Sequence, residues 1–353
     1  SCALRISYRG SAPYARCRLR AVVCTDEAGD NEGTIPRSDD AGRPSSTQSI
    51  GEAMYLYHKV EEITVSTSDS RHAIGAFILR EHAHLSQYTI ADIAEATFTS
   101  KPSITRFAKH LGFDGWRDFI RAFMAEELGE KDSKITVDPN FPFRPGDSDE
   151  TIIQNIGDLQ AAAIADTYDH LDRAMLRRAV RYLDAARIVR VFGLSPNCYV
   201  ADLFCRKLVT IGKQASVVTA GETGIQSRAL GRQDCAIFVS YSGNTDHSSR
   251  STAISTLMER GVSLIGITGA GDNFVRQTIP CTLTISSHER LYNKIANYST
   301  EESINYLLNI LFSCVFARNY ERNLQYRLES SRVLEGERSV HSGDRPSEDD
   351  AEG

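Results

Sequence analysis

Short apolar runs rich in β-branched residues recur along the second half of the chain, and helix-length segments separate them. The runs read RIVRVFG, ASVVT, CAIFVS, VSLIGI and CTLTIS. Strands that alternate with helices in this way are typical of a parallel sheet covered by helices on both faces. The pattern predicts an α/β domain over residues 151–325, closed by a long helix over about 299–322.

The segment before this domain has a different periodicity. Over residues 54–130 apolar side chains recur every three to four positions, as at Ile104, Phe107 and Leu111, which is typical of amphipathic helices. Residues 131–150 contain three prolines and many polar side chains, so we interpret them as a linker. A chain of 353 residues is long enough for two cores. We therefore expect an all-α domain followed by an α/β domain.

Both ends of the chain lack these patterns. Residues 1–53 show no periodicity and carry seven arginines without a lysine, so we expect a disordered extension upstream of the first folded segment, which opens at Met54. The last 25 residues carry eight acids and three arginines. We expect residues 326–353 to form a disordered acidic tail.

Composition narrows the classes of function. A net charge of −6 argues against uniform binding to nucleic acid or anionic membranes, so any DNA contact must come from a local patch. Eight cysteines occur without a C-x-x-C pair or a Cys/His cluster at zinc spacing, which favours reduced thiols in the cytoplasm and no metal site. The longest apolar run, residues 304–317, is interrupted by polar residues and is too short to span a bilayer. We expect a cytoplasmic protein without a membrane partner or a cofactor.

The stretch TSKPSITRFAKHLGF, residues 99–113, places a proline in the first turn of an amphipathic helix. Proline is tolerated there because the first N–H groups of a helix have no partner within it, and Ser100 is suited to cap the helix. Two short helices, over 89–96 and 100–111, are joined by about three residues, as in a helix-turn-helix. Five Lys or Arg against two Asp between residues 100 and 121 give a local charge of +3. The spacing alone fits both a DNA-reading helix and an ordinary helical hairpin with a solvated face.

The sequence TIADIAEATFTSKPSITRFAKHLGFDGWRDFIRAF resembles the N-terminal domain of the RpiR family of bacterial transcription regulators. The resemblance runs without a gap through Ser100, Ser103, Ile104, Arg106, Phe107, Leu111, Gly112, Phe113, Gly115 and Trp116. It implies that the second short helix reads double-stranded DNA in the major groove. The residues that we predict to contact DNA are Thr89, Ser100, Lys101, Pro102, Ser103, Thr105, Arg106, Lys109 and His110.

In the second domain, the sequence VSYSGNT, residues 239–245, follows one of the apolar runs and precedes a helical segment. Hydroxyl groups and free backbone N–H groups at a helix N-terminus form an anion-binding site, and Gly243 lets the backbone approach a phosphate closely. Ligands of open parallel sheets bind beyond the carboxyl ends of the strands, where this loop falls. A serine- and glycine-rich connecting turn is the alternative interpretation.

A second loop lies in VFGLSPNCYVADLFCRKLVTIG, residues 191–212. Together the two loops resemble the sugar isomerase (SIS) domain, which binds phosphosugars and which the RpiR family joins to its helix-turn-helix. The resemblance covers residues 71–322, although the first loop usually reads G-x-G-x-S and here reads GLSPN over 193–197. It implies a SIS-type α/β domain whose ligand residues are Gly193, Ser195, Asn197, Ser240, Ser242, Gly243, Asn244 and Thr245.

These features predict a transcriptional regulator of sugar-phosphate or amino-sugar metabolism genes. We expect it to bind operator DNA as a homodimer or homotetramer, with a phosphosugar effector that modulates DNA binding. A phosphosugar isomerase and a regulator whose SIS domain only dimerises are the alternatives. No convincing general base lies near residues 240–245, and Glu301 and Glu302 are explained by the dipole of the helix that they open. We therefore expect no catalytic residues and no enzymatic activity.

Overall fold

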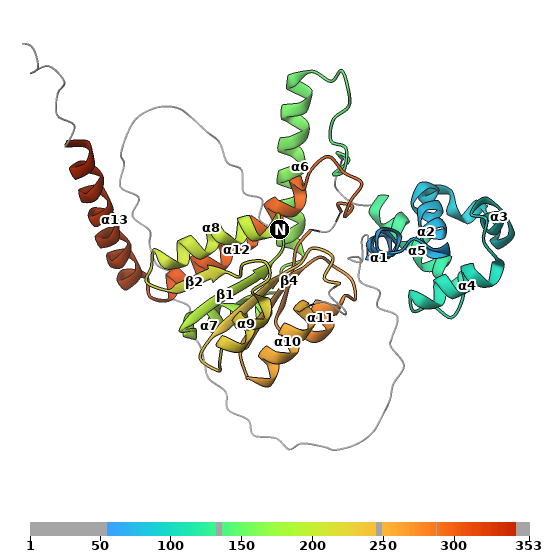
Figure 1. Cartoon of the computed structure of the whole chain (residues 1–353). Helices are drawn as coiled ribbons and strands as arrows, with labels where there is room; N and C mark the ends of the chain where they lie inside the picture. The colour runs from blue at the N-terminus through green and yellow to red at the C-terminus, as the bar shows by residue number, and fades with distance from the viewer. Residues whose placement is uncertain (1–54, 132–135, 245–248, 287, 344–353) are drawn as a thin grey trace, which may run out of the picture. The chain divides into compact units, whose positions relative to one another are not determined.

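The computed structural model describes residues 55–131, 136–244, 249–286 and 288–343 (Figure 1). The predicted extension over residues 1–53 lies outside the described residues. Within the described part of the chain, no helix combines the length and the apolar character that crossing a membrane requires.

The first domain is helical, as its periodicity predicts. Its elements are α1 (Tyr55–Ser66), α2 (Ser70–Arg80), the 3-10 helix η1 (His82–Gln87), α3 (Ile90–Ala96), α4 (Lys101–His110) and α5 (Trp116–Lys131). Side chains from all of these elements share one core, in which Phe107, Phe119 and Phe123 are among the largest buried groups. The first helix is fastened to the last, because the Glu126 carboxylate accepts the backbone N–H groups of Leu56 and Tyr57.

Both short helices are capped at their starts, and the cap predicted at Ser100 is confirmed. The Thr89 hydroxyl accepts the N–H of Asp92 at 3.2 Å, while the Asp92 carboxylate accepts the N–H of Thr89 at 2.8 Å, which forms a capping box. The Ser100 hydroxyl accepts the N–H of Ser103 at 3.3 Å, and Pro102 lies in the first turn of α4. These caps fix where α3 and α4 begin.

The turn between α3 and α4 is strained at Phe98. Its φ of 51° is positive, and Phe98 is the one non-glycine residue in the described ranges with this property. The left-handed region crowds a Cβ-bearing residue against the following carbonyl oxygen, at a cost of roughly 1–2 kcal/mol. The side chain is 98% exposed, so packing within the domain contributes little to offset this cost.

Replacing Phe98 with glycine should therefore stabilise the helical domain. Glycine adopts a positive φ freely, and we expect the free energy of unfolding to rise by roughly 0.5–1 kcal/mol after the added flexibility of the unfolded chain is subtracted. Urea denaturation of the full-length chain, followed by the fluorescence of Trp116, measures the change. The matched control is Phe141→Gly, at an exposed phenylalanine without a positive φ, which should not gain stability. A loss of stability in Phe98→Gly would contradict this reading of the turn.

The second domain is the predicted α/β domain. Its elements are α6 (Asp149–Asp169), α7 (Arg173–Ala185), β1 (Ile188–Gly193), α8 (Asn197–Val209), β2 (Gln214–Val217), α9 (Thr223–Ala229), β3 (Cys235–Val239), α10 (Ser249–Glu259), β4 (Ser263–Thr268), α11 (Phe274–Thr278), β5 (Thr282–Thr284), α12 (Tyr298–Arg318) and α13 (Tyr320–Gly343). In the described residues, β2, β1, β3, β4 and β5 form one sheet in that order, with parallel pairing throughout.

Helices cover both faces of this sheet (Figure 1). On one face α7, α8 and α12 pack against alternate strand residues such as Val191, Ile237 and Ile265. On the other face α10 and α11 pack against Phe238 and Leu264, while α9 lies beside α10. Burial on both faces explains why β3 reads as a continuous apolar run instead of an alternating one.

The C-terminal prediction is wrong over residues 326–343. The sequence predicts one helix over 299–322 and a disordered tail from 326, whereas α12 ends at Arg318 and α13 continues to Gly343. Near the start of α13, the Gln325 side chain donates to the Glu329 carboxylate one turn further along the helix. The prediction of disorder rests on the acidic composition of the segment, which does not reveal the helical spacing of its residues. Residues 344–353 lie outside the described residues.

Candidate functional site

The order of the strands places a topological switch point at the carboxyl ends of β1 and β3. The chain leaves β1 toward β2 on one side, and β3 lies on the other side of β1. At such a switch point the connections diverge to opposite faces of the sheet, and ligands of doubly wound folds bind there. Gly193 pairs with Val239 across this boundary. The structure therefore brings the two predicted ligand loops to the same point.

The loop after β3, residues 240–244, is held in one shape by its own hydrogen bonds and is called the ligand loop below. The Ser240 hydroxyl accepts the N–H of Gly243 at 3.3 Å, and the Ser242 hydroxyl accepts the N–H of Asn244 at 3.4 Å. Gly243 has a φ of +70°, and a Cβ added there would lie 2.2 Å from the buried Asn273 side chain. Only glycine fits this position. Thr245 and the neighbouring His247 lie outside the described residues.

The loop after β1 is more open. Gly193 ends the strand, Ser195 is exposed, and Asn197 begins α8, as the sequence predicts. A Cβ at Gly193 would meet Val239 and Cys198 at 3.6–3.8 Å, which is ordinary van der Waals contact. The departures from G-x-G-x-S, at Ser195 and Asn197, change the side chains offered to a ligand.

The predicted DNA-contacting residues gather on α4 and on the capped helix starts. Ile104, Phe107 and Ala108 are buried on the inner face of α4. Lys101, Pro102, Arg106, Lys109 and His110 are exposed on the outer face, as are the caps Thr89 and Ser100, while Ser103 and Thr105 are half-buried. This arrangement of charged and hydroxyl groups around the first turns of a helix suits contact with phosphates and base edges.

The outer face of α4 extends to the start of α2, which the sequence analysis does not single out. Asp69, Ser70 and Arg71 line a hollow of about 290 Å³ together with Ser103, Arg106, Phe107 and His110. Arg71 is bound to Asp69 at 2.9 Å, and Arg106 donates to the Ser103 hydroxyl at 3.0 Å. Both guanidinium groups are thereby oriented on one surface of the helical domain.

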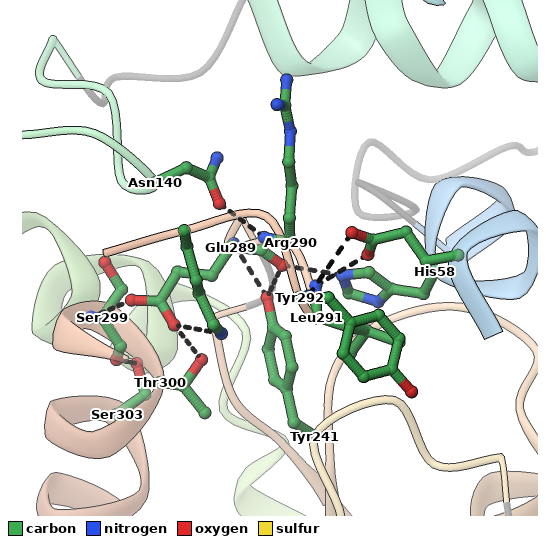
Figure 2. Close-up of polar contacts among 12 residues, drawn as sticks. His58, Asn140, Tyr241, Glu289, Arg290, Leu291, Tyr292, Ser299, Thr300 and Ser303 are labelled. Carbon is green, nitrogen blue, oxygen red and sulfur yellow. Dashed lines mark hydrogen bonds and ion pairs between the residues drawn. The ribbon is translucent and has the colours of Figure 1, made fainter. Parts of the chain in front are cut away.

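A segment that sequence reasoning missed, residues 289–295, connects β5 to α12 and is called the junction loop below. The carboxylate of Glu289 is 0% exposed and accepts the N–H of Ser299 and the hydroxyl of Thr300, both at 2.5 Å (Figure 2). Lys294, with a side chain 8% exposed, contacts the same carboxylate at 3.2 Å. The N-terminus of α12 favours a negative charge, so the loop is anchored to the start of this helix.

The peptide of Glu289 joins the ligand loop to the helical domain. The Tyr241 hydroxyl donates to the Glu289 carbonyl at 2.6 Å and accepts the Glu289 N–H at 2.8 Å. His58 of α1 donates through Nε2 to the same carbonyl at 2.7 Å (Figure 2). Burial lowers the pKa of His58 to about 4, so its ring is neutral at physiological pH. One carbonyl oxygen therefore accepts from both domains.

Two further contacts hold the junction loop. The buried carboxylate of Glu61 accepts the N–H groups of Leu291 at 2.7 Å and Tyr292 at 3.4 Å. Burial raises the pKa of Glu61, and the backbone N–H groups oppose that rise. From the linker, the Asn140 side chain accepts the N–H of Arg290 at 2.6 Å (Figure 2). No local motif marks these residues, because their partners are backbone groups far away in the sequence.

Removing Glu289 should destabilise the α/β domain strongly. Glu289→Ala leaves Lys294 buried without its counter-charge and frees the start of α12, so we expect the free energy of unfolding to fall by about 3–5 kcal/mol. In the double variant Glu289→Ala/Lys294→Ala the loss should be smaller than the sum of the two single losses. Urea denaturation followed by circular dichroism measures all three. The exposed pair Arg121–Asp118 is the matched control, and Arg121→Ala should change stability by less than about 1 kcal/mol. Additive losses would mean that the buried pair is not coupled.

Comparison with known proteins shows which family the helical domain resembles. Residues 54–131 match the helix-turn-helix domain of the rpiR family. This match is confined to the helical domain. The predicted resemblance is confirmed, and the interpretation of α3 and α4 as an ordinary hairpin is set aside.

Similar proteins extend over most of the chain. A protein of Caldanaerobacter subterraneus subsp. tengcongensis, named as an HTH-type transcriptional regulator, is 25% identical over 78% of this chain and 95% of its own length. The solved structure of the Vibrio vulnificus NanR protein complexed with ManNAc-6P covers 80% of this chain and 97% of its own, at 18% identity and a TM-score of 0.50. The sugar isomerase domain of an RpiR transcription factor from Sphaerobacter thermophilus covers 51% of this chain and 97% of its own, at 20% identity and a TM-score of 0.45.

The predicted fold class is therefore confirmed: an rpiR-type helix-turn-helix domain precedes a SIS-type α/β domain. The chain has the organisation of helix-turn-helix transcriptional regulators.

Proposed function

We propose that the protein binds operator DNA through α4 and changes its DNA affinity when a phosphosugar binds at the ligand loop. The observation that carries the proposal is the position of a hydroxyl-rich, glycine-containing loop at the β1/β3 switch point of a chain whose other domain is a helix-turn-helix. The similar NanR structure contains ManNAc-6P, which favours a sugar phosphate as the effector class. The regulated genes would then belong to sugar-phosphate or amino-sugar metabolism.

The DNA-contacting residues of this proposal are the exposed groups of α4 and its caps. A helix-turn-helix gains useful specificity by reading two half-sites, so the working form is a homodimer or a homotetramer. The ligand contacts come from Gly193, Ser195 and Asn197 on one loop and from Ser240, Ser242, Gly243, Asn244 and Thr245 on the other.

The surroundings of Glu289 suit a structural role better than proton transfer to a sugar. An isomerase needs a carboxylate that reaches the sugar, and the Glu289 carboxylate is enclosed by Ser299, Thr300 and Lys294. The isomerase alternative predicts turnover of an aldose/ketose phosphate pair by the purified protein, and an assay for that turnover tests it directly.

Selection of bound fragments from the source genome tests the proposal as a whole. Purified protein at near-physiological salt should enrich one or a few palindromic sites, because sequence-independent binding weakens steeply as salt rises. A panel of sugar phosphates is then titrated against the selected sites. If the protein enriches only a salt-sensitive background of fragments, it is not a sequence-specific regulator. If it enriches specific sites but no sugar phosphate changes its affinity for them, the proposed effector is wrong.

Arg106→Ala should weaken DNA binding without unfolding the helical domain. The variant removes an exposed cation from α4, so we expect a loss of about 1–3 kcal/mol and a reduction of about 1 in the slope of log affinity against log salt. Fluorescence anisotropy with a selected site at several salt concentrations measures both. Arg228→Ala, at an exposed arginine on α9, is the matched control and should bind DNA as the unmodified protein does. Equal losses in both variants would remove Arg106 from the DNA surface.

Ser242→Ala should abolish the response to the sugar phosphate while DNA affinity in its absence stays unchanged. The hydroxyl lies in the ligand loop, where it would donate to a phosphate oxygen. The response is measured as the shift in DNA affinity on adding the sugar phosphate. Ser255→Ala, at an exposed serine on α10, is the control. A full response in Ser242→Ala would exclude this hydroxyl from the site.

A further inference from the structure

Helix α1 presents two different faces to the two domains. Leu56, Tyr57 and Val60 are buried in the core of the helical domain. His58, Glu61 and Glu62 follow at helical spacing on the other side of α1, and each of these three contacts the α/β domain. Because α1 is fastened to α5 through Glu126, any movement of α1 carries the DNA-reading domain with it.

Glu61 fills an anion-binding position of the α/β domain. Successive backbone N–H groups of the junction loop, those of Leu291 and Tyr292, point at its carboxylate. Converging backbone N–H groups of this kind form a nest that binds anions without regard to their source. The helical domain thus docks by offering a carboxylate to a site built from main chain.

The side chain of Glu62 contacts the ligand loop itself. Its Oε2 accepts a hydrogen bond from the Asn244 side chain at 3.0 Å. Arg250 on α10, which follows the ligand loop, lies close enough for its charge and that of Glu62 to attract each other. An amide donor and a guanidinium beside a glycine-containing loop are groups that also bind phosphate. In the docked arrangement a carboxylate of the helical domain accepts from the amide and attracts the guanidinium.

A phosphate in the ligand loop would therefore meet a negative charge already in place. Like charges a few ångströms apart disfavour each other most where solvent is partly excluded, and Glu62 is half-buried. The two anions also compete for Asn244. Tyr241 and His58 share the carbonyl of Glu289, so a displacement of the ligand loop reaches the contacts of α1 through a single peptide (Figure 2).

We propose that Glu61 and Glu62 act as internal anions that dock the helical domain, and that a phosphate bound in the ligand loop displaces Glu62 and releases α1 from the junction loop. The inference rests on the proposed ligand site and specifies how that site regulates the DNA-reading domain. Coupling of this kind is reciprocal, so any operator that favours the released domain also raises the affinity for the phosphate.

Inorganic phosphate and the full-length chain provide the test. Glu62→Gln keeps an oxygen for Asn244 and removes the charge, so it should bind phosphate about three- to tenfold more tightly than the unmodified chain, as measured by calorimetry. Glu95→Gln, at an exposed acid on α3, is the matched control and should leave the affinity unchanged. Chloride at equal ionic strength separates screening from binding.

Hydrogen–deuterium exchange of the Leu291 and Tyr292 amides reports docking directly. Phosphate should accelerate their exchange in the unmodified chain and in Glu95→Gln, because Glu61 leaves both amides when α1 is released. Asn244→Asp places a permanent charge opposite Glu62, so exchange should be fast before phosphate is added and should not increase further. This isosteric variant tests the coupling from the other domain.

The possible outcomes distinguish failure of the internal-anion mechanism from failure of the proposed phosphate site. Equal phosphate affinities in Glu62→Gln and the unmodified chain, with slow exchange at Leu291 and Tyr292 throughout, would overturn the internal-anion device and leave the phosphate site standing. Absence of phosphate binding in every variant would overturn both. Tighter binding in Glu62→Gln with phosphate-accelerated exchange in the unmodified chain would support both.

Discussion

The buried carboxylate of Glu289 fixes the segment on which both domains depend. Ser299, Thr300 and Lys294 hold the carboxylate against the start of α12, and the peptide of the same residue is gripped by Tyr241 and His58. A buried charge of this kind contributes little net stability, because desolvation opposes the attraction between the ions. Its effect is geometric. The carbonyl of Glu289 can accept from two domains only because the side chain holds the peptide in place.

Much of the architecture could be predicted because it is encoded locally. The alternation of apolar runs and helical segments gives the parallel sheet, and short-range side-chain contacts such as the Thr89–Asp92 capping box give the helix starts. The ligand loop was recognisable for the same reason. Ser240 and Gly243 lie a few residues apart, and the close fit of Gly243 against Asn273 explains why glycine stands there.

The contacts between the domains could not be predicted from the sequence. His58 binds a carbonyl 231 residues away, and Glu61 binds an amide 230 residues away. Their partners are backbone atoms, which every residue carries, so no side-chain pattern identifies them. An acidic pair on a helix, such as Glu61 and Glu62, usually indicates a solvent-exposed face. Residues 326–343 show the opposite error, because their charged composition predicts disorder although they form part of a helix.

The fit around Gly243 also limits how the effector preference of such a protein can change. Every amino-acid substitution of a glycine introduces a residue with a Cβ, and here that atom would collide with Asn273 and Thr268. The ligand loop is thus closed to substitution at this position. The side chains of Leu194 and Ser195, on the loop after β1, are exposed and have no such restriction. Under the proposed function, mutational drift would therefore alter which sugar is accepted while the phosphate position stays the same.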